Sequence, residues 1–152
     1  SAPYCQDGSQ LKVNCATVDG VVLPTLVNGK NVGLAGALPP SLGELGSSLE
    51  FLELSSNAIT SVPTELGALT GLVNLRMHNN ALTSVPSEIG DLTGLTQLEL
   101  SYNQLTGVPA EFRIINPTDG CYLYNAPDPI SCANVGAGTT CCTSQNCGDT
   151  ST

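Results

Sequence analysis

Apolar residues recur along the middle of the chain with a fixed period. Leu49, Leu72 and Leu95 begin three segments of one pattern, since 72−49 = 23 and 95−72 = 23. Each segment reads L-x-x-L-x-[LM]-x-x-N-x-[LI] and then Val-Pro, so apolar residues, asparagine and proline recur together. A repeat of roughly 20–50 residues is typical of a solenoid, in which each coil packs mainly against its neighbours.

Within each repeat, apolar and polar residues alternate, which predicts a short strand with one inward face. The alternating inward pairs are Leu52 and Leu54, Leu75 and Met77, Leu98 and Leu100. Two further apolar columns extend the predicted inner stack: Ile59, Leu82 and Leu105, then Val62, Val85 and Val108. Pro63, Pro86 and Pro109 end the extended stretch, and segments such as Glu65-Leu66-Gly67 are expected to return as short helical or 3₁₀ turns.

Asn57, Asn80 and Asn103 occupy the position where each repeat leaves its strand. A buried asparagine side chain can satisfy backbone groups that no strand pairing reaches. We therefore predict a structural role for all three residues.

The same frame extends in both directions. A weaker coil is predicted over 24–48, and 95+23 = 118 places Cys121 at the position that Leu98 holds one coil earlier. The prediction is five stacked strands whose inward residues run from Val27 to Cys121.

These features resemble the leucine-rich repeat family over roughly residues 21–128. The segment from Gly36 to Gly43 is similar to the plant-type extracellular pattern, from which the coil departs at Val32, where asparagine is expected. The resemblance, which includes polygalacturonase-inhibitor-like proteins and receptor ectodomains, implies an α/β repeat. The expected fold is a right-handed solenoid of about five coils, with a parallel concave sheet, short helical or 3₁₀ turns on the convex side and cysteine-rich caps. The expected single domain, 1–152, comprises a cap at 1–20, repeats at 21–117, and a last strand and cap at 118–152.

Seven cysteines in 152 residues indicate an oxidising compartment. The resemblance implies an N-terminal cap in which Cys5 is bridged to Cys15. The other five cannot all pair, and their connectivity stays open; they are Cys121, Cys132, Cys141, Cys142 and Cys147. A zinc site is the weaker alternative for these five, because paired C-x-x-C knuckles are missing. We expect a secreted, extracellular or otherwise exported protein, a lumenal one included.

Thirteen acidic residues against four basic ones give a net charge of −9. This charge opposes binding to nucleic acid or to an anionic membrane. No apolar run approaches the ~18 residues of a membrane span, so membrane insertion is not expected. His78 is the single histidine, and we expect neither a metal nor a cofactor.

The residues between the inward positions form columns that we expect to project from the concave face into solvent. One column is Asn28, Glu53, Arg76, Glu99 and Tyr122, and its neighbour is Lys30, Ser55, His78, Ser101 and Tyr124. The first column is either a solvated charge ladder or part of a recognition patch. Exposed aromatics beside Arg and His favour a binding surface, although Tyr122 and Tyr124 packed under the C-terminal cap is an equal alternative. The predicted ligand-binding residues are Glu53, Arg76, His78, Glu99, Tyr102, Tyr122 and Tyr124.

The sequence therefore favours a non-catalytic protein that binds a protein, peptide or glycan on its concave face. The main alternative is an extrinsic docking subunit of a larger, membrane-associated assembly. A remote alternative is ice binding by the stacked hydroxyls of Thr60, Thr83 and Thr106. A hydrolase that uses His78 between Ser55 and Ser101 is disfavoured, because a flat array offers neither a cleft nor evident oxyanion donors.

Overall fold

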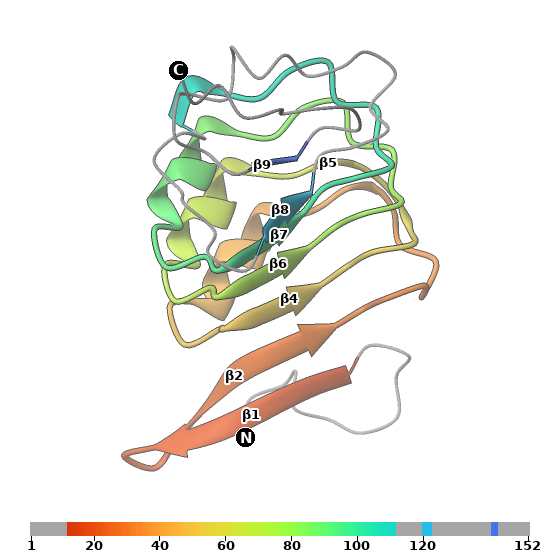
Figure 1. The fold of residues 1–152 in the computed structure, drawn as a ribbon. Coiled ribbons are helices and arrows are strands. Elements are labelled where there is room, and N and C mark those ends of the chain that lie inside the picture. The colour runs from red at the N-terminus through yellow and green to blue at the C-terminus, as the bar shows by residue number, and fades with distance from the viewer. Residues whose placement is uncertain (1–11, 112–119, 123–140, 143–152) are drawn as a thin grey trace.

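The computed structural model describes residues 12–111, 120–122 and 141–142. The described chain forms a solenoid with a seven-stranded sheet along one side and a column of 3₁₀ helices along another (Figure 1). The strands, in sheet order, are β1 (Lys12–Val18), β2 (Val21–Asn28), β4 (Phe51–Glu53), β6 (Asn74–Arg76), β7 (Gln97–Glu99), β8 (Gly120–Tyr122) and β9 (Cys141–Cys142). The helices are η1 (Pro40–Leu45), η2 (Thr64–Ala68) and η3 (Ser87–Asp91). The predicted strands and short outer turns are thus confirmed.

The register of the parallel strands is the predicted one. Val27 pairs with Leu52, Leu52 with Leu75, Leu75 with Leu98, and Leu98 with Cys121. The first coil is longer than the others, because 52−27 = 25 whereas 75−52 = 23. Every strand of this series therefore presents equivalent residues to the same side of the sheet.

Leucines fill the space between the sheet and the helices. Leu52, Leu75 and Leu98 are each 0% exposed, and Leu66 and Ile89 close the core from the helices. Ile59, Leu82 and Leu105 are buried as predicted, whereas Val62 and Val108 are only partly buried at its margin.

The three asparagines act as predicted. Oδ1 of Asn57 accepts hydrogen bonds from the backbone N–H of Val32 and Leu34, at 3.2 and 3.0 Å. Its Nδ2 donates to the carbonyl oxygens of Gly29, Leu54 and Ser55. Asn80 and Asn103 repeat this arrangement one and two coils later. One amide side chain thus links two adjacent coils at each turn.

A second, two-stranded sheet was not predicted. It pairs β3 (Ala35–Ala37) with β5 (Ala58–Ser61) in parallel, with a register shift between Gly36 and Ala37. From the sequence, Ile59 is expected only as part of the inner stack. The residues around it are extended and their backbone groups need partners, which the neighbouring coil supplies.

At its N-terminal end the sheet begins with an antiparallel hairpin of β1 and β2. The connecting residues Asp19 and Gly20 have φ of 50° and 80°, as a two-residue type I′ turn requires. Cys15, in β1, is disulfide-bonded. Cys5 lies outside the described residues, so the Cys5–Cys15 pairing stays a prediction.

The remaining cysteines are described only in part. Cys132 and Cys147 lie outside the described residues, and the backbone of Cys141 pairs in parallel with that of Cys121. The described part of the chain has no helix long and apolar enough to cross a membrane. It also has no group of three His, Cys, Asp or Glu residues placed to hold a metal ion.

Candidate binding surface

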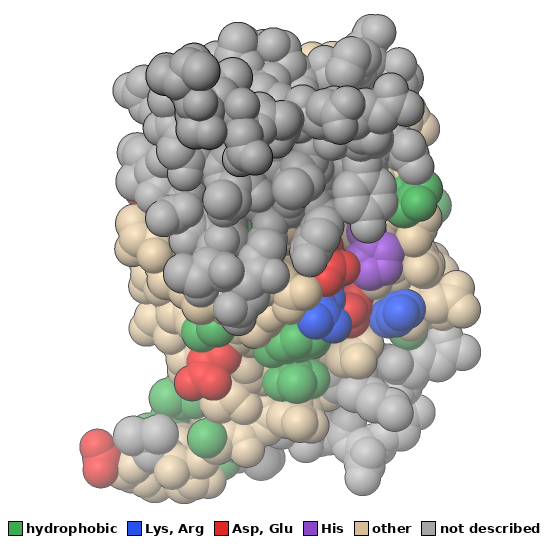
Figure 2. Space-filling view, viewed as in Figure 1, with side chains coloured by type: hydrophobic (Ala, Val, Ile, Leu, Met, Phe, Trp, Pro, Cys, Tyr) green, Lys and Arg blue, Asp and Glu red, His purple; other side chains and the backbone are tan. Residues whose placement is uncertain are grey.

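Three consecutive strands bring together the charged residues that the sequence singled out. Glu53, Arg76 and Glu99 end β4, β6 and β7, and the register places them directly beside one another. His78 follows two residues after Arg76 and points to the same side of the sheet. We call this solvent-side surface of the sheet the strand face, and we call Glu53, Arg76, His78, Gln97 and Glu99 the charged cluster. Figure 2 shows acidic, basic and histidine side chains gathered on this face, next to hydrophobic ones.

Arg76 is the centre of the charged cluster. Its Nη1 lies 3.9 Å from Glu53 Oε2, and its Nε lies 3.4 Å from Glu99 Oε1. Its Nη2 donates a hydrogen bond of 2.8 Å to Gln97 Oε1, and Gln97 Nε2 donates one of 2.7 Å to Glu99 Oε1. The guanidinium also stacks 5.3 Å from the ring centroid of Phe51, a cation–π distance. Four neighbours from the two adjacent strands therefore fix one cation, whose side chain is still 33% exposed.

The expectation that this column projects into solvent is wrong for Glu53. Glu53 is 4% exposed, and it accepts hydrogen bonds from the backbone N–H and the hydroxyl of Ser55. Ser55 and Ser101, at 0% and 4%, are buried as well. Strands lie only about 4.8 Å apart, so long side chains such as Arg76 reach over their shorter neighbours. Glu53 is thus a buried ion-pair partner of Arg76, whereas Glu99 is partly exposed.

His78 extends the cluster. Its Nδ1 lies 3.0 Å from Glu99 Oε2, although the alignment falls short of a hydrogen bond. The His78 side chain is 21% exposed and that of Glu99 is 19% exposed. Glu99 therefore faces two buried nitrogen atoms, Arg76 Nε and His78 Nδ1, and neither has an aligned hydrogen-bond acceptor among the described residues.

The three predicted tyrosines have different places. Tyr102 is 48% exposed and lies three residues after the end of β7. The backbone of Tyr122 lies in β8 in register with Glu99. Tyr124 lies outside the described residues. The binding role of all seven predicted residues stays a prediction, although four of them form one cluster.

The predicted binding residues did not include Phe51 and Gln97, although both belong to a further column between the inward positions. Each precedes an acidic residue of the cluster by two positions, and alternation in a strand places both residues on the same side of the sheet. That spacing was the available signal.

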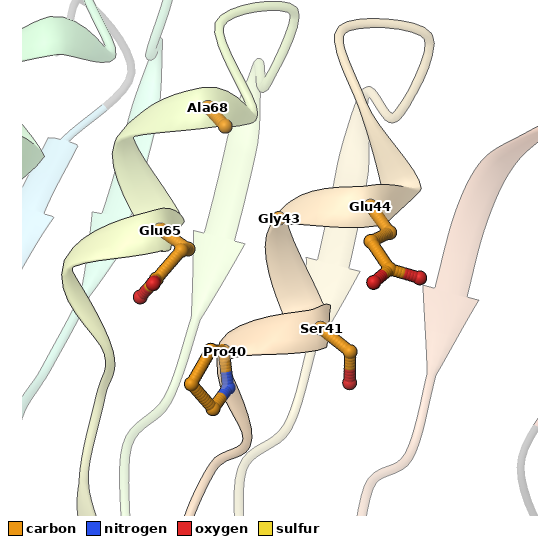
Figure 3. A pocket seen from close by; sticks show the side chains of 6 residues that line it. All are labelled: Pro40, Ser41, Gly43, Glu44, Glu65 and Ala68. Carbon is orange, nitrogen blue, oxygen red and sulfur yellow. The ribbon is translucent and has the colours of Figure 1, made fainter.

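The serines of the disfavoured hydrolase arrangement do not act on His78. Ser55 donates its hydroxyl to Glu53, and in the described part of the chain no serine hydroxyl bonds to His78. A cavity of about 370 Å³ lies elsewhere, between η1 and η2 (Figure 3). It is lined by Pro40, Ser41, Gly43, Glu44, Glu65 and Ala68. The charged cluster does not line this cavity.

A row of hydroxyls follows the turn after each strand. Thr60, Thr83 and Thr106 are all exposed, and the amide of Thr106 lies 3.5 Å from the carbonyl oxygen of Thr83. Stacked coils therefore repeat the same hydroxyl at the same place.

Comparison with known proteins gives the family. A leucine rich repeat model matches residues 47–105. The BIR2 ectodomain from Arabidopsis thaliana is 31% identical with a TM-score of 0.64, over 75% of this chain and 60% of that one. A chain of the BIR3–SERK2 complex from Arabidopsis thaliana is 27% identical with a TM-score of 0.66, over 91% of this chain and 77% of that one.

A plant ice-binding protein is 28% identical with a TM-score of 0.62, over 73% of this chain and 36% of that one. This chain covers 60% of the BIR2 ectodomain, which is less than two thirds of its length. No protein with a curated description is significantly similar to it in sequence. The 23-residue repeat, the strand register and these matches show that the chain belongs to the leucine-rich repeat family, with repeats like those of extracellular plant receptors.

Proposed function

We propose that this chain is a non-catalytic recognition protein that binds a protein partner on the strand face. The observation that carries the proposal is the charged cluster, which holds the partly exposed side chains of Arg76, His78 and Glu99 in fixed positions on the strand face. The binding surface extends over Tyr102, Tyr122 and Tyr124.

Fixed arginine and exposed aromatic side chains supply much of the binding energy in protein interfaces. Arg76 is held by neighbours on both adjacent strands, so little side-chain entropy is lost when a partner contacts it. A broad, open surface suits a macromolecule better than a small molecule, which needs a concave pocket.

The similar proteins support this proposal. BIR2 is described as an ectodomain, and the BIR3–SERK2 structure is a complex of two proteins. Peptides and glycans are two further ligand classes that we propose for the same face. We propose an extracellular or otherwise exported location, and the disulfide at Cys15 supports it.

The test is affinity capture from native extract, followed by binding measurements with the identified partner. We expect Tyr102→Ala combined with Tyr122→Ala to weaken binding by about 2 kcal/mol or more. The control combines Glu65→Ala and Glu88→Ala on η2 and η3, which should change binding little. If the control pair is the damaging one, the partner docks on the helices, and a structural docking subunit of a larger assembly becomes the better assignment.

Ice binding is a second candidate, favoured by the exposed row of Thr60, Thr83 and Thr106 together with the similarity to a plant ice-binding protein. Regular hydroxyls about 4.8 Å apart can order water on a flat surface. Inhibition of ice recrystallisation by the purified chain tests it. Thr83→Lys should abolish the effect, whereas Thr93→Lys, at another exposed threonine, should not. No inhibition at all would exclude this candidate.

A further inference from the structure

The described bases gather at one end of the sheet, where β2, β4 and β6 reach their carboxyl-terminal ends. The structure describes three Lys and Arg residues. Arg76 ends β6, Lys30 lies two residues after β2, and the backbone of Lys12 pairs with that of Asn28, the last residue of β2. Figure 2 shows Lys and Arg side chains beside the histidine on the strand face. The described positive charge of the chain is therefore concentrated at this end of the sheet.

Lys30 lies in line with His78 on the strand face. Backbone hydrogen bonds continue the parallel pairing past the strand ends, and they align Lys30 with Ser55 and Ser55 with His78. Successive strands are about 4.8 Å apart, so the backbones of Lys30 and His78 are about 10 Å apart. Ser55 between them is buried, and it donates its hydroxyl to Glu53. Lys30 and His78 are therefore the two residues of this row that can reach a ligand.

Three nitrogen groups at this end have no aligned acceptor among the described residues. Two of them, Arg76 Nε and His78 Nδ1, are buried. The Arg76 group is always a donor, and the His78 group is one when the imidazole carries a proton there. The third is the ammonium group of Lys30, which is exposed and forms no ion pair with any described residue. A buried donor without an acceptor costs free energy, and a ligand that supplies the acceptor recovers it.

Two acids share this end of the sheet, and both are already engaged. Glu53 is 4% exposed and is ion-paired with Arg76. Glu99 contacts Arg76 and His78 but is aligned with neither buried nitrogen. Glu50 is exposed, but it precedes β4 and so lies at the opposite end of that strand. Among the described residues, this end thus holds three bases and His78 against two acids, in a chain of net charge −9. The local charge favours an anionic group of a partner.

We propose that Lys30, Arg76 and His78 bind the carboxylates of an acidic segment of the protein partner, with Asp or Glu side chains as the recognised groups. The inference rests on the proposed function and adds the chemistry of the partner to it. An incoming carboxylate accepts hydrogen bonds from the ammonium, guanidinium and imidazole groups. It competes for the last two with the poorly aligned carboxylate of Glu99.

The experiment is an NMR titration with the blocked pentapeptide Gly-Glu-Gly-Glu-Gly at constant pH, with Gly-Gln-Gly-Gln-Gly as the uncharged control. His78 is the single histidine, so its imidazole signals need no further assignment. We expect the glutamate peptide to shift these signals, and its affinity to fall as salt is added. Unmoved imidazole signals, or equal shifts with the glutamine peptide, overturn the inference. Shifts caused by an oligouronate but not by the glutamate peptide also overturn it, because the site would then be one for an acidic glycan.

Matched variants separate the local contacts from the overall charge. Lys30→Gln should weaken binding of the glutamate peptide about two- to fivefold, the range of a partly exposed ion pair. Thr93→Glu makes the same change in net charge at an exposed position beyond η3, and it should leave the affinity nearly unchanged. Glu99→Gln should strengthen binding about twofold or more by removing a competing carboxylate, whereas Glu50→Gln, with the same change in charge, should not. Equal effects within either pair overturn the inference.

The inference and the proposed function fail independently. A captured partner that contacts the strand face without an acidic segment at Lys30 overturns the inference and leaves the proposed function intact. A partner that docks on η2 and η3 overturns the proposed function, while the peptide titration still decides the chemistry of this end of the sheet.

Discussion

Gly71 and Gly94 occupy equivalent positions in successive coils, since 94−71 = 23, but alanine should destabilise the protein only at Gly71. A Cβ atom at Gly71 would lie 1.9 Å from the carbonyl oxygen of Ser47 and 2.9 Å from its carbon. A Cβ atom at Gly94 would lie 3.5 Å from its nearest neighbour, the carbonyl oxygen of Leu72, which is ordinary contact. Neither glycine has the positive φ that would itself exclude alanine.

The difference comes from the longer first coil. Leu45 and Leu49 are four residues apart, whereas Leu69 and Leu72 are three apart, and the additional residue brings the Ser47 backbone over Gly71. Relief of the contact requires a shift of about 1.5 Å in a backbone whose neighbour Leu49 is fully buried. Overpacking of this kind destabilises a protein by about 1–3 kcal/mol, and occasionally by more.

Gly71→Ala should therefore lower the melting temperature by roughly 2–12 °C for a domain of this size. Gly94→Ala should leave it unchanged or raise it slightly, because alanine restricts the unfolded chain. Differential scanning calorimetry of the two variants beside the unmodified protein measures both shifts. Equal shifts, or a neutral Gly71→Ala, would refute the packing of the first coil on the second as described here.

Three further outcomes are expected. Leu75→Ala, at the centre of the core, should cost about 2–5 kcal/mol of unfolding free energy, and Asn74→Ala on the same strand far less; equal costs would put the strand register in error by one residue. Asn80→Ala should cost about 1–3 kcal/mol in urea titrations, because backbone groups in two coils lose their partner. Peptide mapping under non-reducing conditions should recover Cys5 linked to Cys15, and the prediction fails if Cys5 is found as a free thiol.

The period of 23 was sufficient to predict which residues lie inside and how the strands align. Alternation assigns Leu52 and Leu75 to one side of the sheet, and the asparagine at each turn completes the pattern. Alternation and the turn asparagine are both local signals that repeat in successive coils, so one sequence contains several independent examples of each. The core and the register were predictable for this reason.

Burial on the strand face was not predictable from the same signals. Alternation shows which side of the sheet Glu53 faces, but not whether a side chain from the next strand covers it. The burial of Glu53 depends on the reach of Arg76 across strands and on the hydroxyl of Ser55. The pairing of β3 with β5 likewise depends on contacts between coils, and no periodic pattern in the sequence indicates these contacts.

The columns of a solenoid offer a way to separate structural residues from functional ones. Stacking forces the same backbone conformation on every member of a column, so each member experiences nearly the same local requirement. A residue type that meets the requirement carries no information about function, as the asparagines that link adjacent coils illustrate. Two residues differ in type from the other members of their columns. Arg76 is a base between two acids, Glu53 and Glu99. Tyr102 is an aromatic residue in a column whose earlier members are Asn31, Ser56 and Asn79. Arg76 satisfies its neighbours by forming ion pairs with them, whereas the departure of Tyr102 opposes the local backbone preference. These two departures are therefore the positions at which we expect substitutions to affect binding.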